Sequence, residues 1–296
     1  QSGPADQIVL IDIDRDFAEG QEVYLLHGVA YFPSVDIRVG DSSDYADAAL
    51  IVMTAGAKQK PGESRLDLMK RNVSIIEHLV DDMVAHHSQA VLLMVTNPVD
   101  ILTRVACKRS GWPRNRVLGS GTVLDSARLR YILSRHCDVD VHNVHAYVLG
   151  EHGDSEFAAW SMTHIGGVAI ASYCRQCKKC ENWIEERTHI EKQVRQSAYH
   201  IIDYKGATWF AVGLALTRIT EAILRNRKSV LTVSVHLQGE YGIDDVALSV
   251  PCLVSAQGVE TIIEGKLSEQ EQAALENSAN TLRNYIARLE DDTKAP

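Results

Sequence analysis

The stretch Ala49-Leu50-Ile51-Val52-Met53-Thr54-Ala55-Gly56 is an apolar run that ends in small and polar residues. Two further runs have this form: residues 8–11 lead into Asp12, and residues 91–95 lead into Thr96-Asn97-Pro98. Continuous apolar runs of this length are typical of parallel strands buried on both faces. The pattern therefore predicts an α/β fold whose strands present their carboxyl ends to a ligand.

A helix is predicted between the strands at residues 49–53 and 91–95. Apolar residues recur there at spacings of three and four, which is the period of one helix face. These residues are Leu66, Met69, Val73, Ile76, Val80 and Met83. The first part of the chain is therefore expected to alternate strands with helices.

The second part of the chain changes character. We predict a strand at 144–149, helices at about 185–204 and 211–224, and strands at 230–235 and 247–253 around a turn at Tyr241-Gly242. Ser268 and Glu271 form a capping box for a final helix that ends near residue 289. We place a domain boundary near Ser120-Gly121, which gives domains of residues 1–120 and 121–296.

Composition restricts the class of protein. The 296 residues are 45% hydrophobic and 23% charged, as in ordinary globular proteins. A net charge of -9 argues against binding to nucleic acid or to an anionic membrane surface. No apolar run approaches the roughly 18 residues of a membrane span, and we expect no signal peptide.

The six cysteines do not form the pattern of a disulfide scaffold. Cys174, Cys177 and Cys180 form a C-x-x-C-x-x-C run, but a closed zinc site needs four ligands and no fourth is evident. We therefore expect a polar surface segment and no metal. Cys107, Cys137 and Cys252 are expected to be core thiols, and the whole pattern fits a reducing, cytoplasmic compartment.

The segment Gly150-Glu151-His152-Gly153-Asp154-Ser155 follows a predicted strand and contains a candidate acid–base group. A histidine exchanges protons near neutral pH, and a carboxylate on its second ring nitrogen fixes the tautomer. Asp125 is the candidate partner of His152. Arg128 lies three residues after Asp125, on the same face of a helix, and a guanidinium binds a carboxylate through two hydrogen bonds. The alternatives are a structural histidine and a surface ion pair.

Three further positions follow strand ends. The polar loop at 58–65 is placed to close over a ligand, where Arg65 would polarise a carbonyl group; the alternative is a solvated loop. Asn97 would donate to a substrate or cofactor, or else it begins a helix. Asp12 would bind a ribose diol, or else it terminates its strand.

In order and spacing these segments resemble those of the L-lactate/L-malate dehydrogenase family, and within it the bacterial L-lactate dehydrogenases. The resemblance runs over nearly the whole chain. Its strongest segments are Thr54-Ala55-Gly56 through Arg65, Thr96-Asn97-Pro98-Val99-Asp100, Gly119-Ser120-Gly121 through Arg128, Gly150 through Ser155, and Lys205-Gly206-Ala207-Thr208. It implies a Rossmann-like doubly wound parallel sheet, which binds the dinucleotide, followed by an α+β substrate domain.

The resemblance also implies roles for individual residues. His152 would donate and accept the proton, Asp125 would be its partner, and Arg65 would polarise the carbonyl. Substrate contacts would come from Gln59, Asn97, Arg128 and Thr208. Cofactor contacts would come from Asp12, Gly56, Ala57, Val95, Asn97 and Ser120. The implied reaction is hydride transfer from reduced nicotinamide (NADH) to pyruvate, with the proton from His152.

Gln59 matches the loop position where malate enzymes of this family carry arginine. A neutral amide leaves a second substrate carboxylate unpaired, which disfavours oxaloacetate by on the order of 10³-fold. Pyruvate and lactate are therefore the expected substrates. Arg130 and His145 match the positions that bind fructose 1,6-bisphosphate in activated relatives, which implies a homotetramer with allosteric activation. The alternative is that both are ordinary surface residues.

The chain departs from the family pattern at its start. The family opens with a strand, a Gly-x-Gly-x-x-Gly turn and a helix, and this unit of roughly 25 residues has no counterpart before residue 8. The strand would lie in the centre of the sheet, beside the strand at 8–11. Two interpretations follow: a fragment of an active dehydrogenase, or a truncated paralogue that binds cofactor weakly and acts as a binding or assembly subunit. A malate dehydrogenase-like enzyme is a further alternative.

Overall fold

The computed structural model describes residues 3–58, 60, 62–177, 182–205 and 208–293. The first part of the chain contains β1 (Gln7–Leu10), α1 (Arg15–Leu26), β2 (Asp36–Val39), β3 (Leu50–Met53), α2 (Arg65–Ala85), β4 (Val91–Met94), α3 (Val99–Ser110) and β5 (Val117–Gly119). The alternation of strands and helices confirms the predicted α/β class. Ile76, Val80 and Met83 are fully buried, as the predicted helix face requires.

The second part is built from longer helices and antiparallel strands. Its elements are α4 (Val123–Cys137), β6 (Val144–His145), β7 (Val148–Leu149), β8 (Phe157–Ala158), β9 (His164–Ile165), β10 (Val168–Ala169), α5 (Ile170–Cys177), α6 (Trp183–Lys205), α7 (Phe210–Leu224), β11 (Ser229–Gln238), β12 (Asp244–Ser255), β13 (Gly258–Ile262) and α8 (Glu269–Thr293). The predicted capping box is present at the start of α8, since Ser268 and Glu271 exchange hydrogen bonds.

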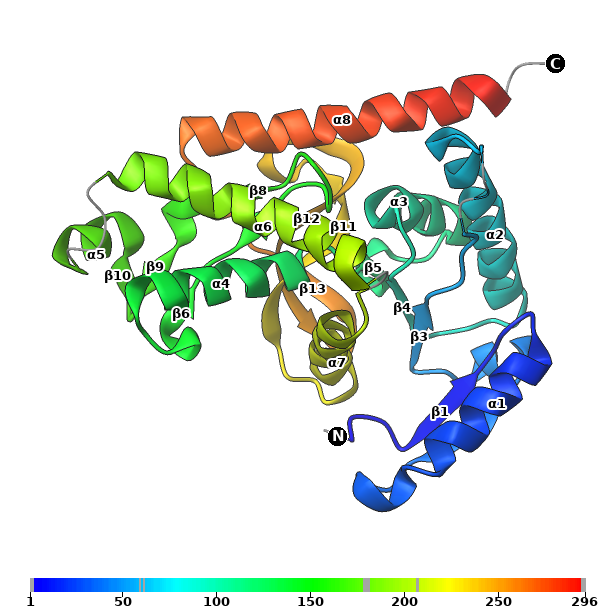
Figure 1. The fold of residues 1–296 in the computed structure, drawn as a ribbon. Helices are drawn as coiled ribbons and strands as arrows, with labels where there is room; N and C mark the ends of the chain where they lie inside the picture. Colours follow the sequence, from blue (N-terminus) through cyan, green and yellow to red (C-terminus); the bar gives the residue numbers. More distant parts are fainter. Residues whose placement is uncertain (1–2, 59, 61, 178–181, 206–207, 294–296) are drawn as a thin grey trace.

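One six-stranded sheet joins the two parts of the chain. Its order is β13-β12-β11-β5-β4-β3, with β3, β4 and β5 parallel and β11 to β13 antiparallel. Ser234 of β11 pairs with Gly119 of β5, so the sheet crosses the boundary placed at residue 120. Figure 1 shows α8 running along one side of the molecule, past elements of both parts.

The fold is the expected Rossmann-like α/β fold, but its parallel strands are divided between two sheets. β1 and β2 pair only with each other, in register Ile8 to Ile37, and form a separate two-stranded sheet. In Figure 1 this sheet and α1 lie at one end of the molecule, beyond β3. The division arises because no strand of the described residues lies between β1 and β3, so each has one unpaired edge there.

The strand predicted at 144–149 is wrong in its continuity. Val144 and His145 form β6 and pair with β9, whereas Val148 and Leu149 form β7 and pair with β8. The change of partner falls at residues 146–147, since the Tyr147 carbonyl already accepts from Ala159, next to β8. The final helix also extends to Thr293 rather than ending near residue 289. Among the described helices, none has the length and apolar character that a membrane crossing requires.

Three apolar clusters hold these layers together. One fills the space between β3, β4, α2 and α3, a second lies between β11, β12, α7 and α8, and a third joins α4, α5 and α6. Cys107, Cys137 and Cys252 are buried within them, as predicted. The helix α4 lies between the second and third clusters and carries the candidate residues Asp125 and Arg128.

The turn from β5 into α4 requires a glycine. Gly121 has a φ of +51°, and a Cβ there would lie 2.6 Å from the Ser234 nitrogen and 2.8 Å from the Thr232 carbonyl oxygen. The next residue, Thr122, donates its backbone N–H to that carbonyl at 3.1 Å. The start of α4 is therefore held against the backbone of β11, and this contact sets the height of Asp125 over the sheet.

We predict that Gly121→Ala lowers the free energy of unfolding far more than Gly111→Ala. Gly111 also has a positive φ, +63°, but no atom lies within 4 Å of the added Cβ. The left-handed backbone costs an alanine roughly 1–2 kcal/mol at either position, and the clash at Gly121 adds about 1–3 kcal/mol. Urea unfolding of the two variants measures the difference, and equal losses would contradict the close packing of this turn.

Candidate active site

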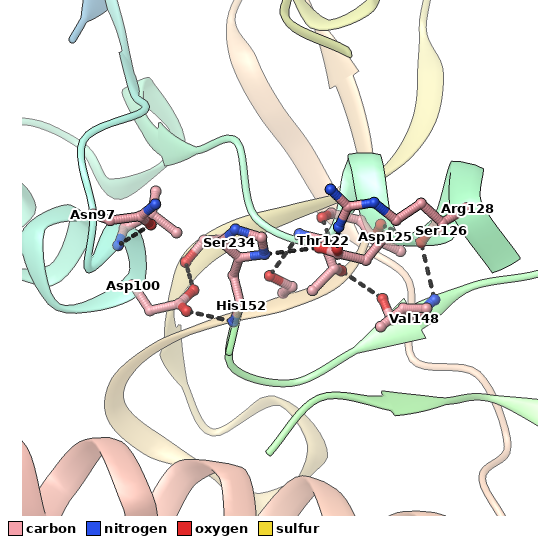
Figure 2. Close-up of polar contacts among 12 residues, drawn as sticks. Asn97, Asp100, Thr122, Asp125, Ser126, Arg128, Val148, His152 and Ser234 are labelled. Carbon is pink, nitrogen blue, oxygen red and sulfur yellow. Dashed lines mark hydrogen bonds and ion pairs between the residues drawn. The ribbon is translucent and has the colours of Figure 1, made fainter. Parts of the chain in front are cut away.

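The candidate residues of the two parts of the chain meet beside the carboxyl ends of β4 and β5. The turn that carries His152 follows β7 and lies between the first turn of α3 and the first turn of α4 (Figure 2). The position is the edge of the sheet at which α/β proteins bind ligands.

His152 and Asp125 are in direct contact. Nδ1 of His152 lies 2.7 Å from Oδ2 of Asp125, and the side chain of Asp125 is only 2% exposed. Because an ionised carboxylate only accepts, Nδ1–H of the imidazole is the donor. The opposite nitrogen, Nε2, is thereby left to exchange a proton with a ligand. The His152 side chain is 28% exposed, which is compatible with that exchange.

The surroundings of His152 favour its protonated form. Burial by itself lowers the pKa of the imidazole, but the bond to Asp125 and the charges of Asp125, Asp100 and Glu156 raise that pKa to about 9. A folded chain thus keeps a proton that an unfolded chain loses above about pH 6.5. This contribution to stability is complete below pH 6.5 and is lost as the pH rises through about 9.

Asp125 has a second cationic partner. A guanidinium nitrogen of Arg128, Nη1, is paired with its other oxygen, Oδ1, and the Arg128 side chain is 14% exposed. Although burial raises the pKa of Asp125, its bond to His152 and the charges of His152 and Arg128 hold that pKa below its usual range. Asp125 and Arg128 are three residues apart on α4, and the turn after β7 brings His152 to them, as Figure 2 shows.

The structure describes only some of the remaining candidate substrate residues. Asn97 is exposed after β4, and its Oδ1 accepts from the Val99 backbone at 3.3 Å. Thr208 is half-buried just before α7. Arg65 is the first residue of α2, but its side chain is outside what the structure describes. Gln59 lies outside the described residues.

The candidate cofactor residues follow the carboxyl ends of successive parallel strands. Asp12 comes after β1, Gly56 and Ala57 after β3, Val95 after β4, and Ser120 after β5. A Cβ on Gly56 would lie 2.5 Å from Cγ2 of Thr96, so only glycine fits there. An exposed acidic group followed by a row of small residues fits an extended ligand such as a dinucleotide.

The two candidate allosteric residues lie apart from this edge. Arg130 is on α4, and its Nε is buried with no hydrogen-bond partner among the described atoms. His145 is exposed on β6. Nothing in the structure of one chain tests the binding of fructose 1,6-bisphosphate by these residues, so it stays a prediction.

Sequence reasoning missed a buried acid beside His152 and Asp125. Glu156 is 5% exposed, and one of its carboxylate oxygens lies within 4.8 Å of ligand atoms of both Asp125 and His152. Burial and the charge of Asp125 raise its pKa to about 8, so it is mostly protonated at neutral pH. The signal in the sequence was a glutamate at the head of the apolar run 157–160.

The metal hypotheses gain little from the structure. Asp125, His152 and Glu156 have the spacing of metal ligands, but the positive charge of Arg128 on Asp125 opposes a cation there. Cys174 is buried in the cluster under α5 rather than on a polar surface. The Cys177 side chain and Cys180 lie outside the described residues, so the three-cysteine site stays untested.

We predict that Asp125→Asn lowers the pKa of His152 below its ordinary value of about 6.5. Burial still disfavours the imidazolium, and the asparagine, which keeps an acceptor oxygen for Nδ1–H, no longer carries the charge that stabilises the protonated ring. Two-dimensional NMR of the ring protons measures this pKa, with His152→Gln to assign the signal. Asp140→Asn is the matched control because it removes the charge from an exposed Asp–His contact, also 2.7 Å long, with His142. An unchanged pKa in Asp125→Asn would refute the electrostatic role.

Comparisons with known proteins agree over both parts of the chain. The family described as lactate/malate dehydrogenase, NAD binding domain, matches residues 1–119, and its alpha/beta C-terminal domain matches residues 122–293. An L-lactate dehydrogenase of Treponema denticola is 56% identical over 98% of this chain and 92% of its own length. One of Acetivibrio thermocellus is 48% identical over 98% and 91%.

Solved structures give the same result. A lactate dehydrogenase, MGS-M5, from a Medee basin deep-sea metagenome library superposes with a TM-score of 0.94 at 43% identity, over 97% of this chain and 92% of that one. The minor L-lactate dehydrogenase of Enterococcus mundtii in its ligands-bound form gives 0.92 at 40% identity, over 96% and 90%. By sequence and by fold, the chain belongs to the lactate/malate dehydrogenase family.

Proposed function

We propose that this protein is an NAD-dependent L-lactate dehydrogenase that interconverts pyruvate and L-lactate. The observation that carries the proposal is the contact of His152 with the buried Asp125, with Arg128 paired to the same carboxylate. The relatives of known name over nearly the whole chain are L-lactate dehydrogenases, which supports the assignment. They disfavour the alternative of a cofactor-poor binding or assembly subunit.

Each residue of the cluster has a distinct task in this reaction. Arg128 binds the substrate carboxylate through its guanidinium fork. In the reduction of pyruvate, Nε2–H of His152 donates a proton to the carbonyl oxygen, and in the oxidation of lactate Nε2 takes it back. Asp125 keeps the ring in the required tautomer and stabilises the imidazolium. The bound nicotinamide supplies or accepts the hydride.

The other candidate residues act on binding and polarisation. Arg65 stabilises the negative charge that develops on the carbonyl oxygen, and Asn97 and Thr208 contact the substrate. Asn97 also faces the cofactor, together with Asp12, Gly56, Ala57, Val95 and Ser120. Residues 1–120 form the dinucleotide-binding domain in this proposal, and residues 121–296 form the substrate domain.

The choice of pyruvate over oxaloacetate rests on Gln59. We predict that Gln59→Arg lowers the ratio of kcat/KM for pyruvate to that for oxaloacetate by on the order of 10³-fold, because arginine pairs the second carboxylate. NADH oxidation with each substrate measures the ratio. Lys60→Arg, which alters the neighbouring loop position without adding charge, is expected to leave it unchanged.

The same assay tests the proposed function itself. It is run on the 296-residue chain and on this chain preceded by a strand, glycine turn and helix of the family pattern. Pyruvate-dependent NADH oxidation by either form supports the proposal. Folded protein that oxidises no NADH with pyruvate in either form would contradict it.

Regulation and assembly form a second part of the proposal. We propose a cytoplasmic homotetramer in which Arg130 and His145 of adjacent copies surround fructose 1,6-bisphosphate. Cationic groups gathered around an axis repel one another until a polyanion bridges them, which couples the sugar to the active form. The Nε of Arg130 is buried and has no hydrogen-bond partner among the described atoms, which supports a role for Arg130 in binding a ligand.

We predict that Arg130→Ala abolishes activation by fructose 1,6-bisphosphate, so that turnover with and without the sugar becomes equal. The change removes the charge that attracts the polyanion. Steady-state NADH oxidation at low pyruvate measures the activation ratio. Arg135→Ala, an exposed arginine on the same helix, is the control and is expected to keep the wild-type ratio. Full activation of Arg130→Ala would remove Arg130 from the site.

A further inference from the structure

The carboxylate of Asp100 joins three segments that are far apart in sequence. Asp100 is 2% exposed and lies in the first turn of α3. Its Oδ2 accepts the backbone N–H of His152 at 2.7 Å, and its Oδ1 accepts the hydroxyl of Ser234 on β11 at 2.5 Å. Figure 2 shows Asp100 between His152 and Ser234, with Asn97 at the start of the same helix.

We propose that Asp100 is a positioning residue of the site: its carboxylate fixes the backbone of His152 relative to Asn97 and places a second negative charge beside the imidazole. The inference rests on the proposed function of His152. Asn97 and Asp100 belong to one turn that follows β4, whereas His152 comes from the other part of the chain. Asp100 thereby connects Asn97, the proposed substrate contact, to His152, the proposed proton donor.

The two hydrogen bonds of Asp100 differ from those of a helix-capping carboxylate. An acid in a first helical turn ordinarily binds the helix's own N–H groups and remains hydrated. Both oxygens of Asp100 are instead directed to residues outside α3, at sequence separations of 52 and 134. Burying a carboxylate is unfavourable unless its oxygens are bonded, so this arrangement persists only because both bonds are made.

The second effect of Asp100 is electrostatic. Its charge is one of those that raise the pKa of His152, after the bond to Asp125 and the charge of Asp125. Burial raises the pKa of Asp100 itself to about 6, so it is ionised above that pH. Other charged groups also shift the pKa values in this site. They are Asp125 and Arg128 from α4, Glu151 and Glu156 from the His152 segment, and Arg195 from α6.

Two substitutions separate the two effects. Asp100→Asn keeps an oxygen for the His152 N–H and an amide for Ser234 but removes the charge. We expect it to lower the pKa of His152 by about one pH unit, with kcat at low pH close to wild type. Asp100→Ala removes the acceptor as well. We expect kcat to fall by roughly 10- to 100-fold at every pH, with little change in the KM for pyruvate, because Arg128 still binds the carboxylate.

A purely structural role for Asp100 is tested by a control on the same helix. Thr103 is fully buried in α3, and its hydroxyl donates to the Val99 carbonyl of the same helix at 2.7 Å. Thr103→Val is expected to lower stability while leaving both the pKa of His152 and kcat unchanged. If it reproduced the effects of the Asp100 variants, general loosening of α3 would explain them and the proposal would be wrong.

The readouts distinguish this proposal from the proposed function. The pKa of His152 is measured by NMR on the chain without substrate or cofactor, so it does not depend on turnover. A lowered pKa in Asp100→Asn, in a protein that oxidises no NADH, would sustain the role of Asp100 and reject the dehydrogenase activity. An unchanged pKa in Asp100→Asn together with unchanged kcat in Asp100→Ala, in an active enzyme, would overturn the role of Asp100 alone.

Discussion

The site depends on the burial of one carboxylate between two cations. Asp125 is 2% exposed and is bonded to both His152 and Arg128. An ionised carboxylate without partners at this depth would cost several kcal/mol, so its charge persists only while both partners stay in place. The same constraint fixes both partners, because one oxygen of Asp125 orients the His152 ring and the other holds the Arg128 guanidinium. Removing Asp125 leaves both His152 and Arg128 without the carboxylate that pairs them.

This constraint accounts for the detail of the surrounding backbone. The turn at Gly121 presses the start of α4 against β11, and the His152 turn is bonded to α3 through Asp100 and to α8 through Ser278, which accepts the Glu151 N–H at 2.7 Å. The His152 turn is therefore held by α3, by α8 and, through Asp125, by α4. A histidine on an unsupported loop could not keep a ring nitrogen aligned with a buried carboxylate, so this support is a condition for the proton transfer that we propose.

Much of the fold could be predicted because its signals are local. The apolar runs at 49–53 and 91–95, the face of α2 and the capping box at Ser268 each depend on residues close in sequence. The contact of His152 with Asp125 could be proposed from chemistry, but only tertiary structure places residues 27 apart at 2.7 Å. Asp100 was overlooked because its partners are 52 and 134 residues away. The break between β6 and β7 at residue 146 could not be predicted, because the strands that β6 and β7 pair with decide where each of them ends.

The sheet that runs from β3 to β13 has a consequence for how such proteins can recombine. Its parallel part comes from one end of the chain and its antiparallel part from the other, and they meet where Ser234 pairs with Gly119. A cofactor-binding half therefore cannot be exchanged between relatives as an independent module. A chimera must preserve the register of β5 against β11, together with the close approach at Gly121. A substitution at Gly119, Gly121 or Ser234 would therefore disturb both halves of the sheet at once.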